Sequence, residues 1–142
     1  MAAYIVDASV VIEYLVAGQH TLNARALFTQ AMPGDRFIVP EFCLLECTNV
    51  LWKQVRFQGM PAAQAQGLLK NLKKLPLTRV PAKAALNTAL SIGLTHNLAI
   101  YDSTYVALAK RSNIPLVSLD QPQIRAAAAE GVAVALITNF TP

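Results

Sequence analysis

The stretch LAIYDSTYVALAKRSNIPLVSLD, residues 98–120, decides the fold of this chain. After Asp102 the apolar residues recur at helical spacing, and Asn113 is suited to cap the end of that helix. Residues 116–119 then read as a short buried strand that delivers Asp120 at its carboxyl end. Because ligands bind at that edge of open α/β sheets, both aspartates are candidate site residues. Each could equally be a helix N-cap, a position that aspartate favours.

Outward from this stretch, short apolar segments alternate with helical patterns. The patterns predict strands at 4–6, 37–39, 77–80, 116–119 and 132–137, and helices at 9–15, 21–31, 40–57, 61–75, 81–90, 102–112 and 122–130. No linker, repeat or low-complexity segment interrupts the 142 residues, so we expect one domain over residues 1–142. The alternation predicts an α/β fold with a mainly parallel sheet and helices on both faces.

Four of the eight acidic residues fall where such a fold would bring side chains together. They are Asp7 after the first strand, Glu46 inside the helix 40–57, Asp102 at a helix start, and Asp120. Carboxylates a few Å apart repel by about 4 kcal/mol per pair at an effective dielectric near 20, and cations relieve that repulsion. An all-oxygen set favours Mg²⁺ or Mn²⁺ over zinc, and such ions promote in-line displacement at a phosphodiester.

The cations are unevenly distributed along the chain. Twelve Lys and Arg against eight Asp and Glu give a net charge of +4, and no acid lies between Glu46 and Asp102. That interval holds seven of the twelve cations, namely Lys53, Arg56, Lys70, Lys73, Lys74, Arg79 and Lys83. An acid-free basic interval is typical of contact with a polyanion, although two solvated basic helix faces would look the same.

Composition excludes several other classes of protein. Hydrophobic residues make up 54% of the chain, but the apolar runs fall far short of the roughly 18 residues that span a bilayer. With no signal-type segment, we expect a cytoplasmic protein that contacts no membrane. Cys43 and Cys47 have only two histidines to join them, so we expect buried thiols rather than a zinc site. No phosphate-binding glycine loop and no Ser-His-Asp or Cys-His arrangement occurs.

Four segments match a known family in the right order over nearly the whole chain. They are IVDASVVIEYL around Asp7, VPEFCLLECTNVLWK around Glu46, ALNTALSIGL, and the opening stretch with Asp102 and Asp120. On these segments the chain resembles a PIN domain, and more closely the small toxin ribonucleases of VapC type. The resemblance implies a three-layer α/β/α fold, an acidic pocket for Mg²⁺ or Mn²⁺, and endonucleolytic cleavage of RNA. It also implies a cognate antitoxin and usually a homodimer.

The resemblance assigns roles residue by residue. Asp7, Glu46, Asp102 and Asp120 carry over as metal-binding and catalytic residues. The small polar residues Ser9, Asn49, Thr104 and Ser118 match positions that line or support the pocket, and they could equally be local caps. With RNA as the implied polyanion, the candidate RNA-binding residues are Lys53, Arg56, Lys70, Lys73 and Lys74. Some relatives place a further acid just after the last aspartate, where Gln121, Pro122 and Gln123 follow here, so one or two ions remain possible.

Two other enzyme-like folds fit less well, and one alternative function stays open. A haloacid-dehalogenase-like phosphatase requires a second acid two residues after the aspartate that ends its first strand, but here Ser9 follows Asp7 at that spacing. A receiver domain would need a phospho-acceptor aspartate in mid-chain, within the acid-free interval. The open alternative is a catalytically inactive PIN-like module that binds RNA or protein.

The low charge content predicts association with another chain. Only 14% of residues are charged, against about 25% for a typical domain. Some apolar surface should therefore remain exposed, on the helices that follow Pro40 and Pro61, and a homodimer or an antitoxin would cover it. The candidate residues are Phe42, Trp52, Phe57, Leu68, Leu69 and Leu72. A well-filled core would account for the same composition.

Overall fold

A five-stranded sheet forms the centre of the computed structural model, which describes residues 1–142. The strands are β1 (Ala3–Val6), β2 (Arg36–Pro40), β3 (Leu77–Val80), β4 (Leu116–Val117) and β5 (Val134–Ala135). They lie in the order β3-β2-β1-β4-β5, and every neighbouring pair is parallel. Ile5 of β1 is in register with Ile38 on one side and Leu116 on the other, so apolar residues line up across the middle of the sheet.

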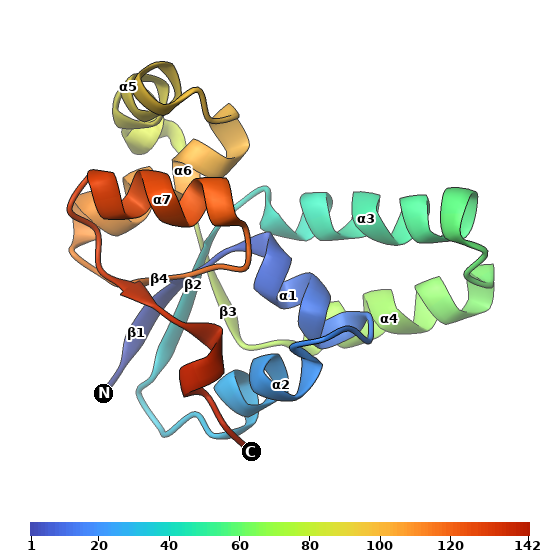
Figure 1. Ribbon diagram of the computed structural model, residues 1–142. Helices are drawn as coiled ribbons and strands as arrows, with labels where there is room; N and C mark the ends of the chain where they lie inside the picture. The colour runs from blue at the N-terminus through green and yellow to red at the C-terminus, as the bar shows by residue number, and fades with distance from the viewer.

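Seven α-helices cover the two faces of this sheet. They are α1 (Ala8–Leu15), α2 (Thr21–Thr29), α3 (Cys43–Gln58), α4 (Ala62–Lys74), α5 (Leu86–His96), α6 (Ile100–Ser112) and α7 (Gln121–Ala129), with short 3-10 helices at Lys83–Ala85 and Ile137–Asn139. The chain builds outward from β1 to β3, then returns to β4 and β5 on the other side. Right-handed crossovers therefore place α1 to α4 on one face and α5 to α7 on the other, which confirms the predicted three-layer α/β/α fold (Figure 1).

The core lies on both faces of the sheet, because its buried residues come from α1, α2 and α3 on one face and from α6 and α7 on the other. Strands β1 and β4 are short, and their buried residues have essentially no exposure, as expected for parallel strands covered on both faces. Helix α6 contacts β1, β2 and β4, and it buries Tyr105, Val106, Ala107 and Ala109. On the opposite side α3 and α4 form a hairpin that projects beyond the sheet (Figure 1). No helix is both long enough and apolar enough to cross a bilayer.

Two of the predicted helix boundaries were wrong for reasons visible in the contacts. Helix α3 begins at Cys43 rather than at Pro40, because Pro40 is the last residue of β2 and pairs with Val80. The helix expected over 81–90 is instead α5, which continues through Gly93 to His96. A Cβ on Gly93 would lie 2.9 Å from the carbonyl oxygen of Leu98, so this glycine permits close packing of α5 on α6 and does not end the helix.

We expect Gly93→Ala to lower the free energy of unfolding by about 1–3 kcal/mol, because the added methyl group has no space. The matched control is Gly67→Ala in α4, where a Cβ would meet nothing within 4 Å. There the change should raise stability by about 0.5–1 kcal/mol, since alanine is the better helix former. Urea unfolding measures both variants. A Gly93→Ala protein as stable as the wild type would contradict this account of the helix contact.

Candidate functional site

The four predicted acids come from four different elements at the carboxyl edge of the sheet. Asp7 follows β1 directly, and Asp120 follows β4 after two residues. The connections diverge between these two strands, and such a point in an open parallel sheet is where a crevice forms. Glu46 lies in the first turn of α3 and Asp102 in the first turn of α6. The sheet edge thus gathers residues that are 113 positions apart at the extremes (120 − 7).

Two of the acids also cap helices, so the same aspartate can be both a helix N-cap and a residue of the candidate site. Asp7 is the N-cap of α1, and its Oδ2 accepts a hydrogen bond from the Ser9 N–H at 3.0 Å. Asp120 is the N-cap of α7, and its Oδ2 accepts from the Gln123 N–H at 3.2 Å. Asp102 does not begin its helix as expected, because Ala99 is the N-cap of α6. Its carboxylate lies within the first turn, where the helix dipole still favours a negative charge.

Two buried residues that no sequence motif marked form hydrogen bonds with the acidic residues. Tyr105 of α6 has no exposed surface, and its hydroxyl donates a hydrogen bond to Glu46 Oε1 at 2.8 Å. Gln123 of α7 is equally buried, and its Nε2 donates to Asp7 Oδ1 and to the Asp102 carbonyl oxygen, both at 3.0 Å. A polar tip on an otherwise apolar helix face was the available signal for Tyr105. No local pattern pointed to the partners of Gln123.

Burial and mutual repulsion make the charged forms of these acids costly. Burial is the main cause that raises the pKa of Asp7, although hydrogen bonds from Ser9 and Gln123 partly offset it. Burial also raises the pKa of Glu46 to about 7, with the Tyr105 hydroxyl acting against it and the charges of Asp7 and Asp102 adding to it. The pKa of Asp102 rises to about 6 by burial and by the charges of Asp7 and Asp120. The four carboxyl groups therefore act on one another as a cluster.

The predicted supporting residues fall into different roles. Ser9 Oγ accepts the Leu119 N–H and Ser118 Oγ accepts the Asp120 N–H, both at 3.0 Å, so these serines hold the segment that presents Asp120. Thr104 Oγ1 donates to the Ile100 carbonyl oxygen at 2.7 Å, which is a local bond within α6. Asn49 is exposed on α3 next to Glu46.

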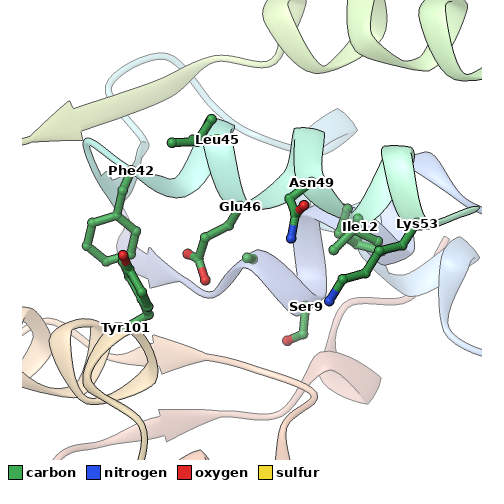
Figure 2. A pocket seen from close by; sticks show the side chains of 10 residues that line it. Ser9, Ile12, Phe42, Leu45, Glu46, Asn49, Lys53 and Tyr101 are labelled. Atoms are coloured by element: carbon green, nitrogen blue, oxygen red, sulfur yellow. The ribbon is translucent and has the colours of Figure 1, made fainter. Parts of the chain in front are cut away.

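An open cleft of about 690 Å³ lies beside the acids. Figure 2 shows the Glu46 carboxylate between two ends of different chemistry, with Asn49 and Lys53 on one side and the rings of Phe42 and Tyr101 on the other. The two rings meet edge to face at 5.0 Å, and Tyr101 is 61% exposed. The full lining is Ala8, Ser9, Ile12, Phe42, Leu45, Glu46, Asn49, Val50, Lys53 and Tyr101.

The structure separates the predicted basic residues. Lys53 lines this cleft, whereas Lys73 lines a different groove with Leu44 and Arg79. Lys74 borders a third hollow, beside Tyr14 and Phe28. The α3–α4 hairpin thus places cations that are close in sequence on different surfaces.

The acids form an all-oxygen donor set, but their side chains do not converge on one point. No three His, Cys, Asp or Glu side chains are close enough to hold an ion as they stand. Capping holds Asp7 and Asp120 in place, and Tyr105 holds one oxygen of Glu46. No hydrogen bond restrains the Asp102 carboxylate, so it is the member of the cluster most able to rotate.

The profile of the PIN domain matches residues 4–129. The chain belongs to the PIN-domain family. Among curated proteins, this PIN domain is 28% identical over 119 residues to ribonuclease VapC3 of Pyrobaculum aerophilum, covering 82% of this chain and 88% of that protein. It is 29% identical over 117 residues to exonuclease VapC9 of the same organism, covering 78% and 82%. Among solved structures, VapBC2 of Rickettsia felis aligns with a TM-score of 0.68 and 11% identity over 94% of this chain and 98% of that chain, which supports the fold alone.

We expect Glu46→Gln to reduce the pH dependence of stability in the presence of a chelator. A raised pKa means that folded Glu46 takes up a proton before the unfolded chain does, so wild-type stability rises as pH falls through about 7. Glutamine carries no such charge. The variant should therefore be more stable than the wild type by about 1 kcal/mol near pH 8, allowing for solvent screening of a half-buried group.

This difference in stability should shrink toward about pH 5, where folded Glu46 is protonated. Urea unfolding at several pH values measures it. The same difference at every pH would show that the Glu46 charge is not the cause.

Proposed function

We propose that this PIN domain is a metal-dependent endoribonuclease that hydrolyses RNA phosphodiester bonds as the toxin of a toxin–antitoxin pair. One observation carries the proposal: four carboxyl groups from four elements act on one another at the carboxyl edge of a parallel sheet. The similarity to VapC3, a protein named as a ribonuclease, supports the reaction class. Asp7, Glu46, Asp102 and Asp120 are the proposed catalytic and metal-binding residues.

Mg²⁺ or Mn²⁺ fits the chemistry of these residues. The donors are all oxygens, which hard divalent ions prefer, and a cation would offset the burial and the mutual repulsion that raise the pKa values of Glu46 and Asp102. A buried oxygen beside the cluster, Gln123 Oε1, also has no partner within the chain. When bound, one or two such ions supply an activated water and stabilise the leaving oxygen.

The remaining residues of the site have positioning roles in this proposal. Tyr105 orients Glu46, while Ser9 and Ser118 fix the segment that carries Asp120. The Lys53 amine borders the cleft beside Glu46 and can hold a phosphate of the RNA. At the other end the exposed ring of Tyr101 offers a surface on which an unpaired base can stack. A single-stranded segment is therefore the expected substrate.

One observation favours the alternative of a catalytically inactive PIN-like module that binds RNA or protein. No three candidate ligands converge as the side chains stand. Against it, all four acids are present, and their charges act on one another. An RNA cleavage assay separates the two functions, because an inactive module would bind RNA without shortening it.

An antitoxin and a second copy of the chain are the proposed partners, in the cytoplasm. VapBC2 of Rickettsia felis was solved bound to a DNA fragment from its promoter. Exposed apolar residues lie on α3 and α5, namely Leu45, Trp52, Phe57, Leu86, Leu90 and Leu94. On α4 the expectation was wrong, since Leu72 is buried in the core and Leu68 and Leu69 are half-buried. The charge-free leucine row on α5 suits a two-fold contact between copies, and the apolar face of α3 beside the cleft suits an antitoxin segment.

We expect Asp7→Asn, Glu46→Gln, Asp102→Asn and Asp120→Asn each to lower RNA cleavage by orders of magnitude. Each change removes one charge from a set that acts together on the ions. Glu130→Gln is the matched control, because Glu130 pairs with Lys110 and His96 away from the site. Total RNA is incubated with Mg²⁺ or Mn²⁺ and the ends are sequenced, which also distinguishes internal cuts from exonuclease products. Equal cleavage by the wild type in excess chelator would exclude the mechanism.

Because the candidate RNA-binding lysines lie on different surfaces, we expect their substitution to have different effects on RNA binding. Lys53→Glu should weaken binding and flatten its dependence on salt, because Lys53 borders the cleft. The triple change of Lys70, Lys73 and Lys74 to Glu tests whether the outer face of α4 belongs to the RNA path. We expect a smaller loss there, since Lys73 and Lys74 line other hollows. Binding to a labelled RNA at several salt concentrations measures both, and equal losses would extend the path over α4.

A further inference from the structure

Gln123 occupies a position at which a different contact would be expected. It lies three residues after the N-cap Asp120, the spacing at which a glutamine side chain commonly reaches back to the N-cap N–H. In this chain Ser118 Oγ already accepts the Asp120 N–H at 3.0 Å. The side chain of Gln123 is therefore released from capping, and it turns inward to a site with no exposed surface.

Gln123 contacts three of the four acidic residues. Its backbone N–H donates to Asp120 Oδ2 at 3.2 Å, and its Nε2 donates to Asp7 Oδ1 and to the Asp102 carbonyl oxygen at 3.0 Å each. Both amide hydrogens are thereby used. The orientation of the amide is fixed as well, because a reversed amide would place Oε1 against two acceptors. One residue of α7 thus ties the end of β1 to the first turn of α6.

The other half of the same amide has no partner. Gln123 Oε1 is the one buried side-chain nitrogen or oxygen in the chain without a hydrogen bond. Burying an unpaired carbonyl oxygen is costly, and an apolar residue of similar size would avoid that cost. An oxygen lone pair held beside a cluster of carboxylates is suited to a cation.

We propose that Gln123 is a neutral fifth member of the cation site, in which its amide nitrogen holds Asp7 against α6 and its Oε1 is an oxygen ligand for the ion. This inference rests on the proposed function, because it requires a cation at the acids. A neutral ligand adds a donor without adding another negative charge to acids that already repel. The amide of Gln123 is therefore both a positioning group and a ligand.

Calorimetric titration of the full chain with Mn²⁺ tests this role. Gln123→Leu should weaken Mn²⁺ binding about 10- to 100-fold, the loss typical when a supporting residue of a metal site is removed. The matched control is Gln121→Leu, the same change on an exposed residue of the same helix, and it should leave affinity unchanged.

A second measurement does not depend on the leucine variant folding. The side-chain carbonyl carbon of Gln123 in labelled wild-type protein should shift in the NMR spectrum when Mg²⁺ is added, while that of Gln121 should not. A purely structural role, acting through the Nε2 bond to Asp7, predicts a larger shift at the side-chain amide nitrogen than at this carbonyl carbon.

The outcomes separate this inference from the proposed function. Unchanged Mn²⁺ affinity in Gln123→Leu, or an unshifted Gln123 carbonyl in Mg²⁺-loaded protein, would overturn the role of Gln123. If Asp102→Asn loses Mn²⁺ binding in the same titrations, the four acids still form a cation site, but Gln123 is not part of it. A wild type that binds no Mn²⁺ would overturn both.

Discussion

The cost of bringing four buried or partly buried carboxylates together at one edge of the sheet is the constraint on which the rest of this structure depends. Four helices begin at that edge, and each presents its amino-terminal end to one acid. Asp7 and Asp120 cap α1 and α7, while Glu46 and Asp102 lie in the first turns of α3 and α6. Each helix dipole stabilises a negative charge there by about 0.3–1 kcal/mol. Burial outweighs this contribution, since the pKa values of Glu46 and Asp102 still rise to about 7 and 6.

The topology of the sheet explains why such a cluster can form at all. β1 lies at the centre, and the chain leaves it on one side and returns on the other, so the strand ends after β1 and β4 open a crevice. Helix α6 packs across the same strands and contributes both Asp102 and Tyr105. The helix with the largest number of buried residues is thus also the one that contributes two side chains to the candidate site.

The sequence was sufficient to predict the order of strands and helices, because β-branched segments and apolar helix faces recur with clear periods. It also indicated that the four acids would lie near one edge of the sheet, since strand ends and helical patterns are visible in the sequence. It could not reveal Gln123 or Tyr105, whose partners lie 116 and 59 residues away in the chain. The helix expected over 81–90 continues through Gly93, because a glycine needed for close packing looks the same in sequence as one that ends a helix. The sequence also did not reveal that the basic interval folds into a hairpin, in which the lysines lie on separate surfaces.

The central claim is that four carboxylates from four elements form one cation site. A crystal structure with Mn²⁺, located by its anomalous scattering, tests this most directly. The account predicts one or two peaks that contact oxygens of Asp7, Glu46, Asp102 and Asp120. Saturating Mn²⁺ without a peak at these acids, or with a peak only elsewhere on the protein, would contradict it.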